Sequence, residues 1–322
     1  MSGISVYERA FRLLFSFSKS CVLATVFHRM PSAPERIVGV DFAAPSKETD
    51  QKRKILALAA QNTGKGEYTI SREGFNAQLF KSSPGWTAKD LLKNLLDLHV
   101  SVLTADFPFS LPISLMSDAG FCSIVGWNSP STTWKALNEF ISQRLSLDCP
   151  VDYSVFAQWR DKVYWKKRHT DDLCRSQPPL KHYYQVLFNM TLLGNVFLSE
   201  LTKSGRFDVV PFQNRNRIPV VEVYPGVVMS SLGIKKYKRR PHECIEAVIR
   251  ALDVKGITLK IDPTVRRICE TYCTGQDGCS DYDAADAFVC TAIGILYKEN
   301  LARPMKTDSN PVCDVEGVIW SI

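Results

Sequence analysis

The sequence predicts an α/β protein, and three observations lead to this prediction. Short apolar runs rich in β-branched residues come first, at Ile37–Phe42, at Lys54–Ala60 and within Glu67–Ile70 or Ala77–Phe80. A helix with leucines at helical spacing then leads directly into an apolar strand, Val100–Ala105. Three strands, a helix and a fourth strand are a typical opening of an α/β domain.

Each of these first elements has a local reason. Ile37-Val38-Gly39-Val40 is a continuous apolar run, which is typical of a central strand buried on both faces. The turn Gly85-Trp86-Thr87 precedes the helix, whose apolar positions are Leu91, Leu92, Leu95 and Leu96. The fourth strand ends at Phe107-Pro108, because proline cannot donate a hydrogen bond to a neighbouring strand.

The remaining elements are mainly helices. Residues from about 113 to 216 are expected to form a helical insertion, with helices at Thr133–Leu145, Val155–Arg168 and Met190–Lys203. A last strand, Ile218–Tyr224, should precede helices at Pro241–Leu252, at Asp262–Cys273 and from Asp283 to about Asn300. The sequence therefore predicts one domain over residues 36–322, preceded by an N-terminal extension over residues 1–35.

The N-terminal extension fits two interpretations. It contains several basic residues, many serines and one acid, Glu8, which is the composition of a mitochondrial presequence. Tyr7, Phe11, Leu14 and Phe15 recur at helical spacing, so the segment can equally be a helix. No run approaches the roughly 18–20 apolar residues that a membrane span needs, so no membrane partner is expected.

Composition narrows the class of protein. The 322 residues are 45% hydrophobic and 23% charged, with a formal net charge of +7, which fits a soluble globular protein with some preference for anions. Ten cysteines lack paired spacing and a secretory leader. We therefore expect buried thiols, a reducing compartment and a cytoplasmic or nuclear location, or a mitochondrial one if the extension is a presequence. The oligomeric state stays open.

Two carboxylates follow apolar strands directly. Asp41 comes after Ile37–Val40, and Asp106 comes after Val100–Ala105. Burying an unpaired charge costs several kcal/mol, so each acid needs a cation, hydrogen bonds or an exposed strand end. Either residue alone is explained more simply as a turn aspartate at the end of its strand. Two strands that both end in aspartate weaken this explanation and favour a functional role for the carboxylates.

Three more acids lie in the C-terminal half. Glu222, within the last predicted strand, can be a metal ligand or can pair with Lys235, Lys236 or Lys238. Asp283 and Asp286 stand three residues apart, so they share one face of the first helical turn. Acids in a first turn also favour the helix dipole, but the rest of this helix is almost wholly apolar and should be buried.

Together these acids predict a site for hard divalent cations, Mg²⁺ or Mn²⁺, which prefer oxygen ligands. Asp41, Asp106, Asp283 and Asp286 are the expected metal ligands, and Glu222 is expected to join them in catalysis. Two ions about 3.5–4 Å apart would activate water and stabilise the leaving oxygen of a phosphodiester. Hydrolysis of nucleic acid, with DNA and RNA both open, is the predicted reaction.

Basic clusters supply candidate contacts to nucleic acid. The residues are Lys166, Lys167 and Arg168, Arg215 beside Arg217, and Lys235, Lys236, Lys238 and Arg239. Trp165 and Tyr237 adjoin two of these clusters, where they can stack on bases. A solvated charged face is the equally weighted alternative.

A series of short motifs follows along the chain: Gly39-Val40-Asp41-Phe42, Asp106-Phe107-Pro108-Phe109-Ser110-Leu111-Pro112, Arg168-His169-Thr170-Asp171, Pro179-Leu180-Lys181, Glu222-Val223-Tyr224-Pro225-Gly226, Tyr237-Lys238 and Asp283-Ala284-Ala285-Asp286-Ala287. Their order and spacing resemble the family catalogued as domain of unknown function 429. This family is a group of predicted nucleases in the ribonuclease-H-like superfamily. The resemblance covers roughly Arg36 to Trp320.

The resemblance implies a ribonuclease-H-like mixed sheet, with three antiparallel strands followed by parallel ones. It implies that Asp41 bridges both metals and that Asp106 is the fourth-strand acid. It also implies that Asp283 and Asp286 are similar to the closing helix acids of RuvC-like resolvases, and that Lys181 contacts phosphate. It gives a reaction class and no substrate.

Two other functions compete with the nuclease prediction. A phosphotransferase of the actin or sugar-kinase type shares the core fold, but such enzymes need glycine-rich turns at phosphates, and Phe-Ala-Ala-Pro-Ser follows Asp41. A non-catalytic nucleic-acid-binding or scaffold protein could retain the same fold. Hydrolases with a serine or cysteine nucleophile are disfavoured, because the chain has no Gly-x-Ser-x-Gly turn.

Overall fold

The computed structural model describes the residues in eight ranges: 34–42, 55–75, 87–127, 131–147, 166–180, 185–270, 282–305 and 313–322. The N-terminal extension, as far as residue 33, lies outside them. The chain from Pro34 to Ile322 is a separate compact unit, and it contains all the elements described below.

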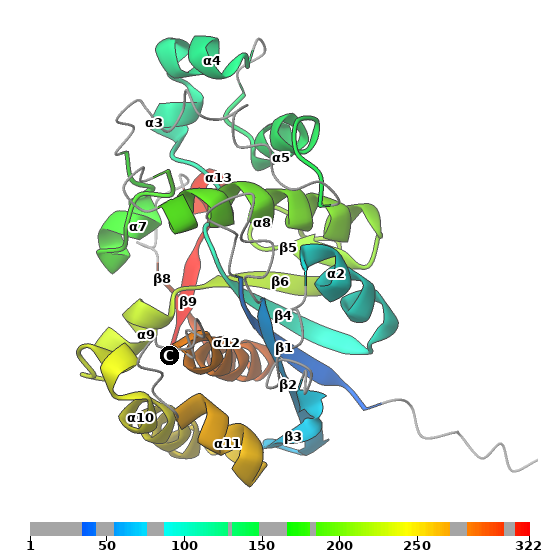
Figure 1. The fold of residues 1–322 in the computed structure, drawn as a ribbon, viewed down its shortest axis with the longest axis vertical. Helices are drawn as coiled ribbons and strands as arrows, with labels where there is room; N and C mark the ends of the chain where they lie inside the picture. The colour runs from blue at the N-terminus through cyan, green and yellow to red at the C-terminus, as the bar shows by residue number, and fades with distance from the viewer. Residues whose placement is uncertain are drawn as a thin grey trace, which may run out of the picture. The chain divides into compact units, whose positions relative to one another are not determined.

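A mixed sheet of nine described strands organises this unit (Figure 1). The order is β7-β3-β2-β1-β4-β6-β9-β8, and β5 also pairs with β6. The strands are β1 Arg36–Asp41, β2 Leu56–Gly64, β3 Glu67–Phe75, β4 Val100–Asp106, β5 Phe207–Val209, β6 Ile218–Val223, β7 Thr258–Ile261, β8 Arg303–Met305 and β9 Ile319–Ser321. The predicted α/β class with a mixed sheet is therefore confirmed.

The strand directions divide this sheet in two. Strand β2 pairs antiparallel with both β1 and β3, whereas β4, β6 and β9 continue from β1 as parallel neighbours. Strand β7 adds to β3 in parallel, and β8 closes the other edge antiparallel to β9. The first strand, β1, consequently stands where the antiparallel and parallel parts meet, with a hydrogen-bonded neighbour on each side.

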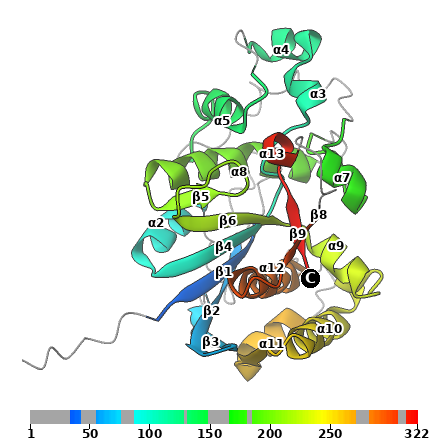
Figure 2. The same ribbon diagram turned by 180° about the vertical axis from the view of Figure 1, so that it is seen from behind.

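Helices cover both faces of the sheet, as the two opposite views show (Figure 1; Figure 2). One hydrophobic cluster joins the sheet to α2 Ala88–Asp97, α5 Trp134–Ser142 and α8 Gln185–Lys203. The cluster on the other face joins it to α9 Pro225–Ser231, α10 Pro241–Val254, α11 Pro263–Glu270 and α12 Tyr282–Lys298. The short helices are α3 Ile113–Met116, α4 Ala119–Val125, α7 His169–Cys174, η3 Tyr237–Arg239 and α13 Cys313–Glu316.

Local sequence explains the start of α2. Thr87 and Asp90 form a reciprocal capping box, in which the Thr87 hydroxyl accepts from the Asp90 amide and the Asp90 carboxylate accepts from the Thr87 amide. Leu91 and Leu95 then lie on the buried face. The predicted leucine face is thus the one that packs against the sheet.

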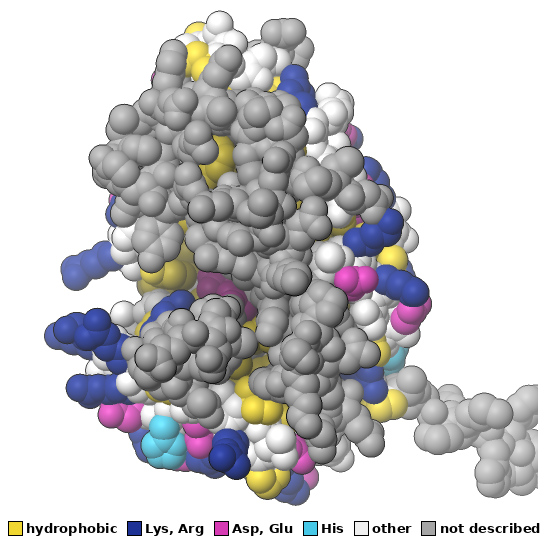
Figure 3. Space-filling view, viewed as in Figure 1, with side chains coloured by type: hydrophobic (Ala, Val, Ile, Leu, Met, Phe, Trp, Pro, Cys, Tyr) yellow, Lys and Arg dark blue, Asp and Glu magenta, His cyan; other side chains and the backbone are white. Residues whose placement is uncertain are grey.

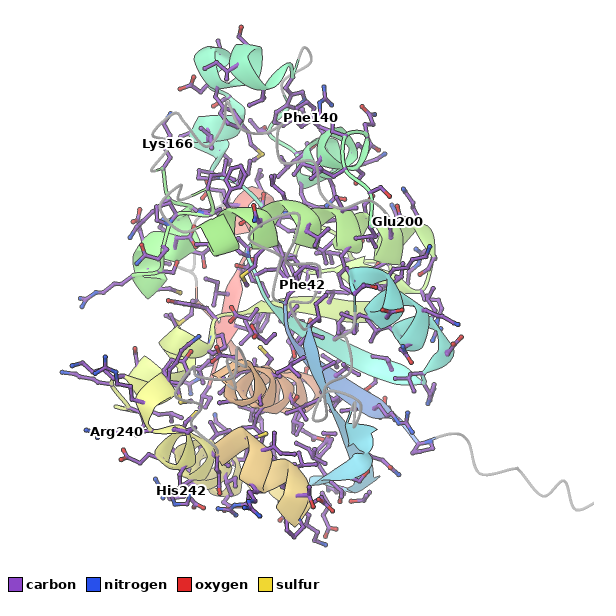
Figure 4. All side chains as sticks on the ribbon, in the orientation of Figure 1. Phe42, Phe140, Lys166, Glu200, Arg240 and His242 are labelled. Atoms are coloured by element: carbon purple, nitrogen blue, oxygen red, sulfur yellow. The ribbon has the colours of Figure 1, made fainter. Side chains whose placement is uncertain are left out.

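The ends of β1 and β4 are anchored by aromatic rings. Phe42 follows Asp41 and Phe107 follows Asp106, and the two ring centroids lie 4.8 Å apart. Phe42 also packs on Phe197 of α8, with centroids 5.4 Å apart (Figure 4). Gly194 of α8 makes room for this cluster, since a Cβ there would lie 2.3 Å from the Phe107 ring. These contacts fix both strand ends against α8.

Helix α12 approaches the opposite face of β1 unusually closely. A Cβ on Gly39 would lie 2.1 Å from the backbone nitrogen of Thr291, and a Cβ on Gly294 would lie 2.6 Å from Cγ2 of Ile37. The Thr104 hydroxyl of β4 donates to the carbonyl oxygen of Cys290, 2.7 Å away. Two glycines and one hydroxyl therefore set how α12 sits on the sheet.

Several element predictions needed correction. Residues 166–168 are not helical, and Arg168 instead precedes α7, so the predicted helix Val155–Arg168 is wrong at its C-terminal end; residues 155–165 lie outside the described ranges. Of the two candidates for the third strand, Glu67–Ile70 is part of β3, and Ala77–Phe80 is not described. Strands β5, β7, β8 and β9 are too short for their apolar pattern to be distinctive.

No helix in the described ranges is both long enough and apolar enough to cross a membrane.

The close approach of α12 predicts a large cost for Gly39→Ala. The added methyl group would overlap the backbone of Thr291, so helix or strand must shift. We expect a loss of about 3 kcal/mol in the free energy of unfolding, measured by urea denaturation. Gly64→Ala is the matched control, because its Cβ would meet nothing closer than 3.8 Å. Equal stability of the two variants would contradict the packing described here.

Candidate metal centre

Three predicted acids come together at one edge of the sheet. Asp41 and Asp106 end the adjacent parallel strands β1 and β4 and stand opposite each other in the strand register. Asp286 approaches them from the first turns of α12. One carboxylate oxygen from each residue lies within 4.8 Å of the others. We call Asp41, Asp106 and Asp286 the acid cluster.

The alternation of side chains along a strand explains this convergence. Consecutive residues point to opposite faces of a sheet. Because Phe42 and Phe107 point towards α8, Asp41 and Asp106 point towards the face that α12 covers. The repeated Asp-Phe pair therefore places an aromatic anchor on one face and an acid on the other.

The acid cluster is largely enclosed. Asp41 is 6% exposed and Asp286 is 1% exposed, while Asp106 is partly exposed. Two like charges about 4 Å apart repel by about 4 kcal/mol at an effective dielectric constant of about 20. Three such carboxylates need positive charge beside them, and carboxylate oxygens are the ligands that Mg²⁺ and Mn²⁺ prefer. The donor set therefore fits a hard divalent ion.

One cation of the chain already contacts the acid cluster. The Lys238 ammonium nitrogen lies 2.6 Å from Oδ2 of Asp286, and the neighbouring Tyr237 hydroxyl donates to Oδ1 of Asp286 at 2.7 Å. Both residues belong to the short helix η3, which follows Lys236 in the left-handed backbone conformation (φ 53°). Two adjacent side chains thus hold both oxygens of one buried carboxylate.

Burial and the neighbouring charges shift the pKa values of Lys238 and Tyr237. Burial alone would lower the pKa of Lys238, but the carboxylates of Asp286 and Asp41 raise it well above its ordinary value. Burial, and then the charge of Asp286, raise the pKa of Tyr237 far above that of a free tyrosine. Both shifts favour the forms that contact Asp286, the charged ammonium group of Lys238 and the protonated hydroxyl of Tyr237.

Glu222 lies in a second, separate network, which corrects its expected role in catalysis. The Arg168 guanidinium donates to Oε1 of Glu222 at 2.6 Å and to Oε2 at 2.8 Å, and the amide of Phe109 also donates to Oε2. Glu222 is not one of the three acids that converge. The alternative, pairing with Lys235, Lys236 or Lys238, is also wrong, because its partner is Arg168.

The prediction that Arg168 contacts nucleic acid is also wrong. Its side chain is 1% exposed and is held between Glu222 and Asp171, which accepts from Nε at 3.0 Å and from Nη2 at 2.8 Å. A guanidinium enclosed in this way cannot contact nucleic acid. Burial opposes its charge, but Asp171 and Glu222 raise the pKa of Arg168. Burial raises the pKa of the Glu222 carboxyl group.

The other predicted basic residues lie at the surface or outside the described ranges. Lys166 donates to Oδ2 of Asp118 and to the carbonyl oxygen of Ser114, and Lys167 lies 3.7 Å from Asp172. Arg215 is exposed, and Asp208 holds its backbone by accepting from its amide. Lys235, Lys236 and Arg239 are exposed beside Lys238. Lys181 and the side chain of Asp283 are not described, although the backbone of Asp283 belongs to α12.

The surface view relates these charges to each other. Figure 3 shows acidic side chains in a hollow near the middle of the face and basic side chains gathered at the edge beside it. Arg240, labelled in Figure 4, lies at this edge. We call residues 235–240 the basic segment. It brings several exposed cations next to the acid cluster.

A second group of possible ligands is an ion network at the surface. His242 and Glu246 of α10 approach Glu270 of α11 closely enough to hold an ion. Arg266 already pairs with both of these glutamates, and Nδ1 of His242 lies 3.2 Å from Oε1 of Glu270 (Figure 4). The cation that these carboxylates need is thus present in the chain.

Sequence reasoning missed the contact of Lys238 with Asp286 and the partnership of Arg168 with Glu222. In sequence, Lys238 is one of several neighbouring basic residues, and the charges themselves do not indicate which one points inwards. The adjacent tyrosine is the signal that was present, because an aromatic residue in a charged run indicates a partly buried position.

The Arg168 network predicts a large loss of stability for Arg168→Met. The change leaves Asp171 and Glu222 buried without their cation, which costs about 3–5 kcal/mol of unfolding free energy at pH 7. A carboxyl group whose pKa is raised in the folded state favours that state at low pH, so the loss should shrink between pH 7 and pH 5.

Urea denaturation at both pH values measures this effect. Arg240→Met, at an exposed arginine that lies 3.4 Å from Glu243, is the control and should change little at either pH. A small loss for Arg168→Met, or one that does not depend on pH, would mean that the buried network contributes little.

Three comparisons were made for the whole chain. No protein-family model, no curated protein and no solved structure matches it.

Proposed function

We propose that this protein is a divalent-metal-dependent nuclease that hydrolyses phosphodiester bonds of nucleic acid at the acid cluster. The observation that carries this proposal is the convergence of Asp41, Asp106 and Asp286, from two adjacent strand ends and one buried helix, to within 4.8 Å. Acids from distant parts of the sequence are held together against their mutual repulsion. Such an arrangement is expected where a cation must be bound.

We further propose that the fold is ribonuclease-H-like and that the chain is a member of the family catalogued as domain of unknown function 429. The sheet supports this assignment through three antiparallel strands, β1 to β3, followed by β4 parallel to β1 and by β6 parallel to β4. The positions of Asp41 on the first strand, Asp106 on the fourth and Asp286 on the last long helix also agree with the resemblance.

Asp41 and Asp106 would hold Mg²⁺ or Mn²⁺ from the sheet, and Asp286 would do so from α12. Hydrolysis adds water across a P–O bond: the water oxygen bonds to phosphorus, the bond to the leaving oxygen breaks, and that oxygen takes up a proton. When bound, a divalent ion lowers the pKa of water and stabilises charge on the phosphate. The protein's part is to hold the ligands rigidly, which the aromatic anchors and the close packing of α12 achieve.

The basic segment supplies an entry for a polyanion. Lys235, Lys236 and Arg239 are exposed and flank Lys238, which contacts Asp286, so a nucleic-acid backbone can be held by these cations while one phosphate reaches the acids. Contacts of this kind position the backbone and carry no sequence information. The proposed substrate is therefore nucleic acid recognised through its phosphates.

Cleavage assays with Asp41→Asn test the nuclease proposal. Labelled single-stranded, duplex, hybrid and four-way-junction substrates are incubated with Mg²⁺, Mn²⁺ or EDTA. We expect metal-dependent cleavage that falls at least about a hundredfold in Asp41→Asn, because a neutral amide is a much weaker ligand for a hard cation.

Asp253→Asn is the control for this assay, because it makes the same exchange at an exposed residue of α10. It should cleave as the unaltered protein does. A folded protein that cleaves none of these substrates would indicate a binding role or phosphotransfer instead, and undiminished cleavage by Asp41→Asn would move the reaction away from the acid cluster.

Arg239→Gln tests the role of the basic segment. Removing one phosphate contact should weaken binding of every nucleic-acid sequence and reduce the slope of log K against log salt concentration by about 1. Fluorescence anisotropy over a range of salt concentrations measures this slope. Lys93→Gln, at an exposed lysine of α2, should leave it unchanged. If both variants behave alike, the basic segment is only a solvated face.

A further inference from the structure

Both oxygens of one carboxylate in the acid cluster are already held by the chain. Oδ2 of Asp286 lies 2.6 Å from the Lys238 ammonium nitrogen, and Oδ1 accepts the hydrogen bond from the Tyr237 hydroxyl at 2.7 Å. A metal ion that binds Oδ2 of Asp286 must share this oxygen with Lys238 or displace the lysine from it. The state of the ion pair between Lys238 and Asp286 therefore influences how well Asp286 binds metal.

We propose that Lys238 is a switch that couples metal binding to the binding of nucleic acid. Without nucleic acid, Lys238 pairs with Asp286 and weakens the binding of a divalent ion there. When a nucleic-acid backbone lies on the basic segment, the Lys238 ammonium group moves to a phosphate oxygen and leaves Oδ2 of Asp286 to the metal. This inference rests on the proposed function and deepens it by naming how the same site is regulated.

Their charges make Lys238 and a metal ion competitors for Asp286. A Mg²⁺ ion on Oδ2 would lie about 2.1 Å from this oxygen, and the Lys238 nitrogen lies 2.6 Å from the same atom, so ion and ammonium group would be no more than about 5 Å apart. Like charges at this distance repel more strongly in a protein than in water, and the double charge of the ion doubles the repulsion. Shared occupancy of Oδ2 therefore lowers the affinity for the metal.

The Lys238 side chain can leave Asp286 without unfolding the segment that carries it. About half of this side chain is exposed (49%), and its stem of four carbons is flexible. The backbone of η3 is held independently of it, because the Arg240 amide donates to the carbonyl oxygen of Tyr237 at 2.7 Å and the Tyr237 side chain packs against the hydrophobic cluster on the α12 face. Movement of one side chain is therefore enough to release Oδ2.

The neighbours of Lys238 explain how nucleic acid would bring it a second partner. Lys235, Lys236 and Arg239 are exposed on either side of it along the chain. A nucleic-acid strand carries one negative charge per phosphate, so a strand held by these cations places phosphates beside Lys238. A phosphate oxygen accepts a charge-assisted hydrogen bond from an ammonium group as a carboxylate does. The phosphate thus replaces Asp286 as the partner of Lys238.

The buried network around Arg168 lacks this possibility of exchange. Arg168 is 1% exposed, and its guanidinium group is paired with Glu222 and with Asp171. A phosphate cannot approach it from solvent. The half-exposed Lys238, in contrast, touches a buried acid with its ammonium group while solvent still reaches the side chain. This difference suits Arg168 to a structural role and Lys238 to a switch.

Mn²⁺ binding in the presence of an uncleavable nucleic acid tests the switch. The purified full-length protein is stripped of metal and titrated with Mn²⁺, and electron paramagnetic resonance distinguishes bound from free ion. Titrations are run with and without single-stranded and duplex DNA and RNA oligonucleotides whose phosphorothioate linkages resist hydrolysis. Ions bound at the acid cluster are those lost in Asp41→Asn.

In the unaltered protein, an oligonucleotide that binds should raise the affinity of the acid cluster for Mn²⁺ at least about tenfold, which lies within the usual range of coupling between two sites. Linkage requires that Mn²⁺ raise the affinity for the oligonucleotide by the same factor. Fluorescence anisotropy of the labelled oligonucleotide, with and without Mn²⁺, measures this second factor.

Lys238→Met removes the competing cation. Without an oligonucleotide, this variant should bind Mn²⁺ at least about fivefold more tightly than the unaltered protein, and the oligonucleotide should then add less than about twofold. Loss of a merely structural contact would not raise the affinity for metal. Lys93→Met, the same exchange at an exposed residue of α2, should behave as the unaltered protein does. Circular dichroism verifies that the variants are folded.

The outcomes separate the switch from the nuclease activity. The switch is overturned if the oligonucleotide raises the Mn²⁺ affinity equally in the unaltered protein and in Lys238→Met, or leaves it unchanged in the unaltered protein. An affinity for Mn²⁺ that is unchanged or lower in Lys238→Met overturns it as well. Metal-dependent cleavage that is lost in Asp41→Asn would still support the nuclease in these cases. If the acid cluster binds no Mn²⁺ with or without an oligonucleotide, both proposals fail.

Discussion

The close packing of α12 against β1 and β4 is the constraint on which the rest of the structure depends. Gly39 and Gly294 leave out the two side chains that would separate helix and sheet, and the Thr104 hydroxyl bonds to the helix backbone. Because of this contact, a carboxylate in the first turns of α12 reaches the ends of two strands. The acid cluster is therefore a consequence of backbone packing in the core, where small shifts are strongly resisted.

Two groups of buried acids in this protein are neutralised in different ways. Asp171 and Glu222 surround the rigid guanidinium of Arg168, and their geometry is closed to solvent. In the acid cluster, Asp286 is paired with Lys238, whose side chain remains half exposed. The first network holds α7 against β6. Because α7 lies in the long chain segment between β4 and β6, this contact also holds part of that segment against the sheet. The second brings together carboxylates from the ends of two adjacent strands and from α12.

The basic segment contacts the acid cluster with some of its residues and solvent with the others. The chain turns at Lys236, where φ is 53°, so that Tyr237 and Lys238 face inwards while Lys235, Lys236 and Arg239 remain exposed. One stretch of chain thus presents exposed cations to solvent and also contacts Asp286 of the acid cluster.

The sequence by itself determined the α/β class, the first and fourth strands and the apolar helix that bears Asp286, because each has a strong local pattern of apolar residues. It also identified Asp41, Asp106 and Asp286 as acids next to buried elements, since a charge beside an apolar run is conspicuous. Only the tertiary structure decided which charges meet. Glu222 and Asp286 are both acids within apolar segments, yet one faces Arg168 and the other Lys238. Pairing between residues 54 and 48 positions apart depends on how helices pack on the sheet, and local composition carries no record of it.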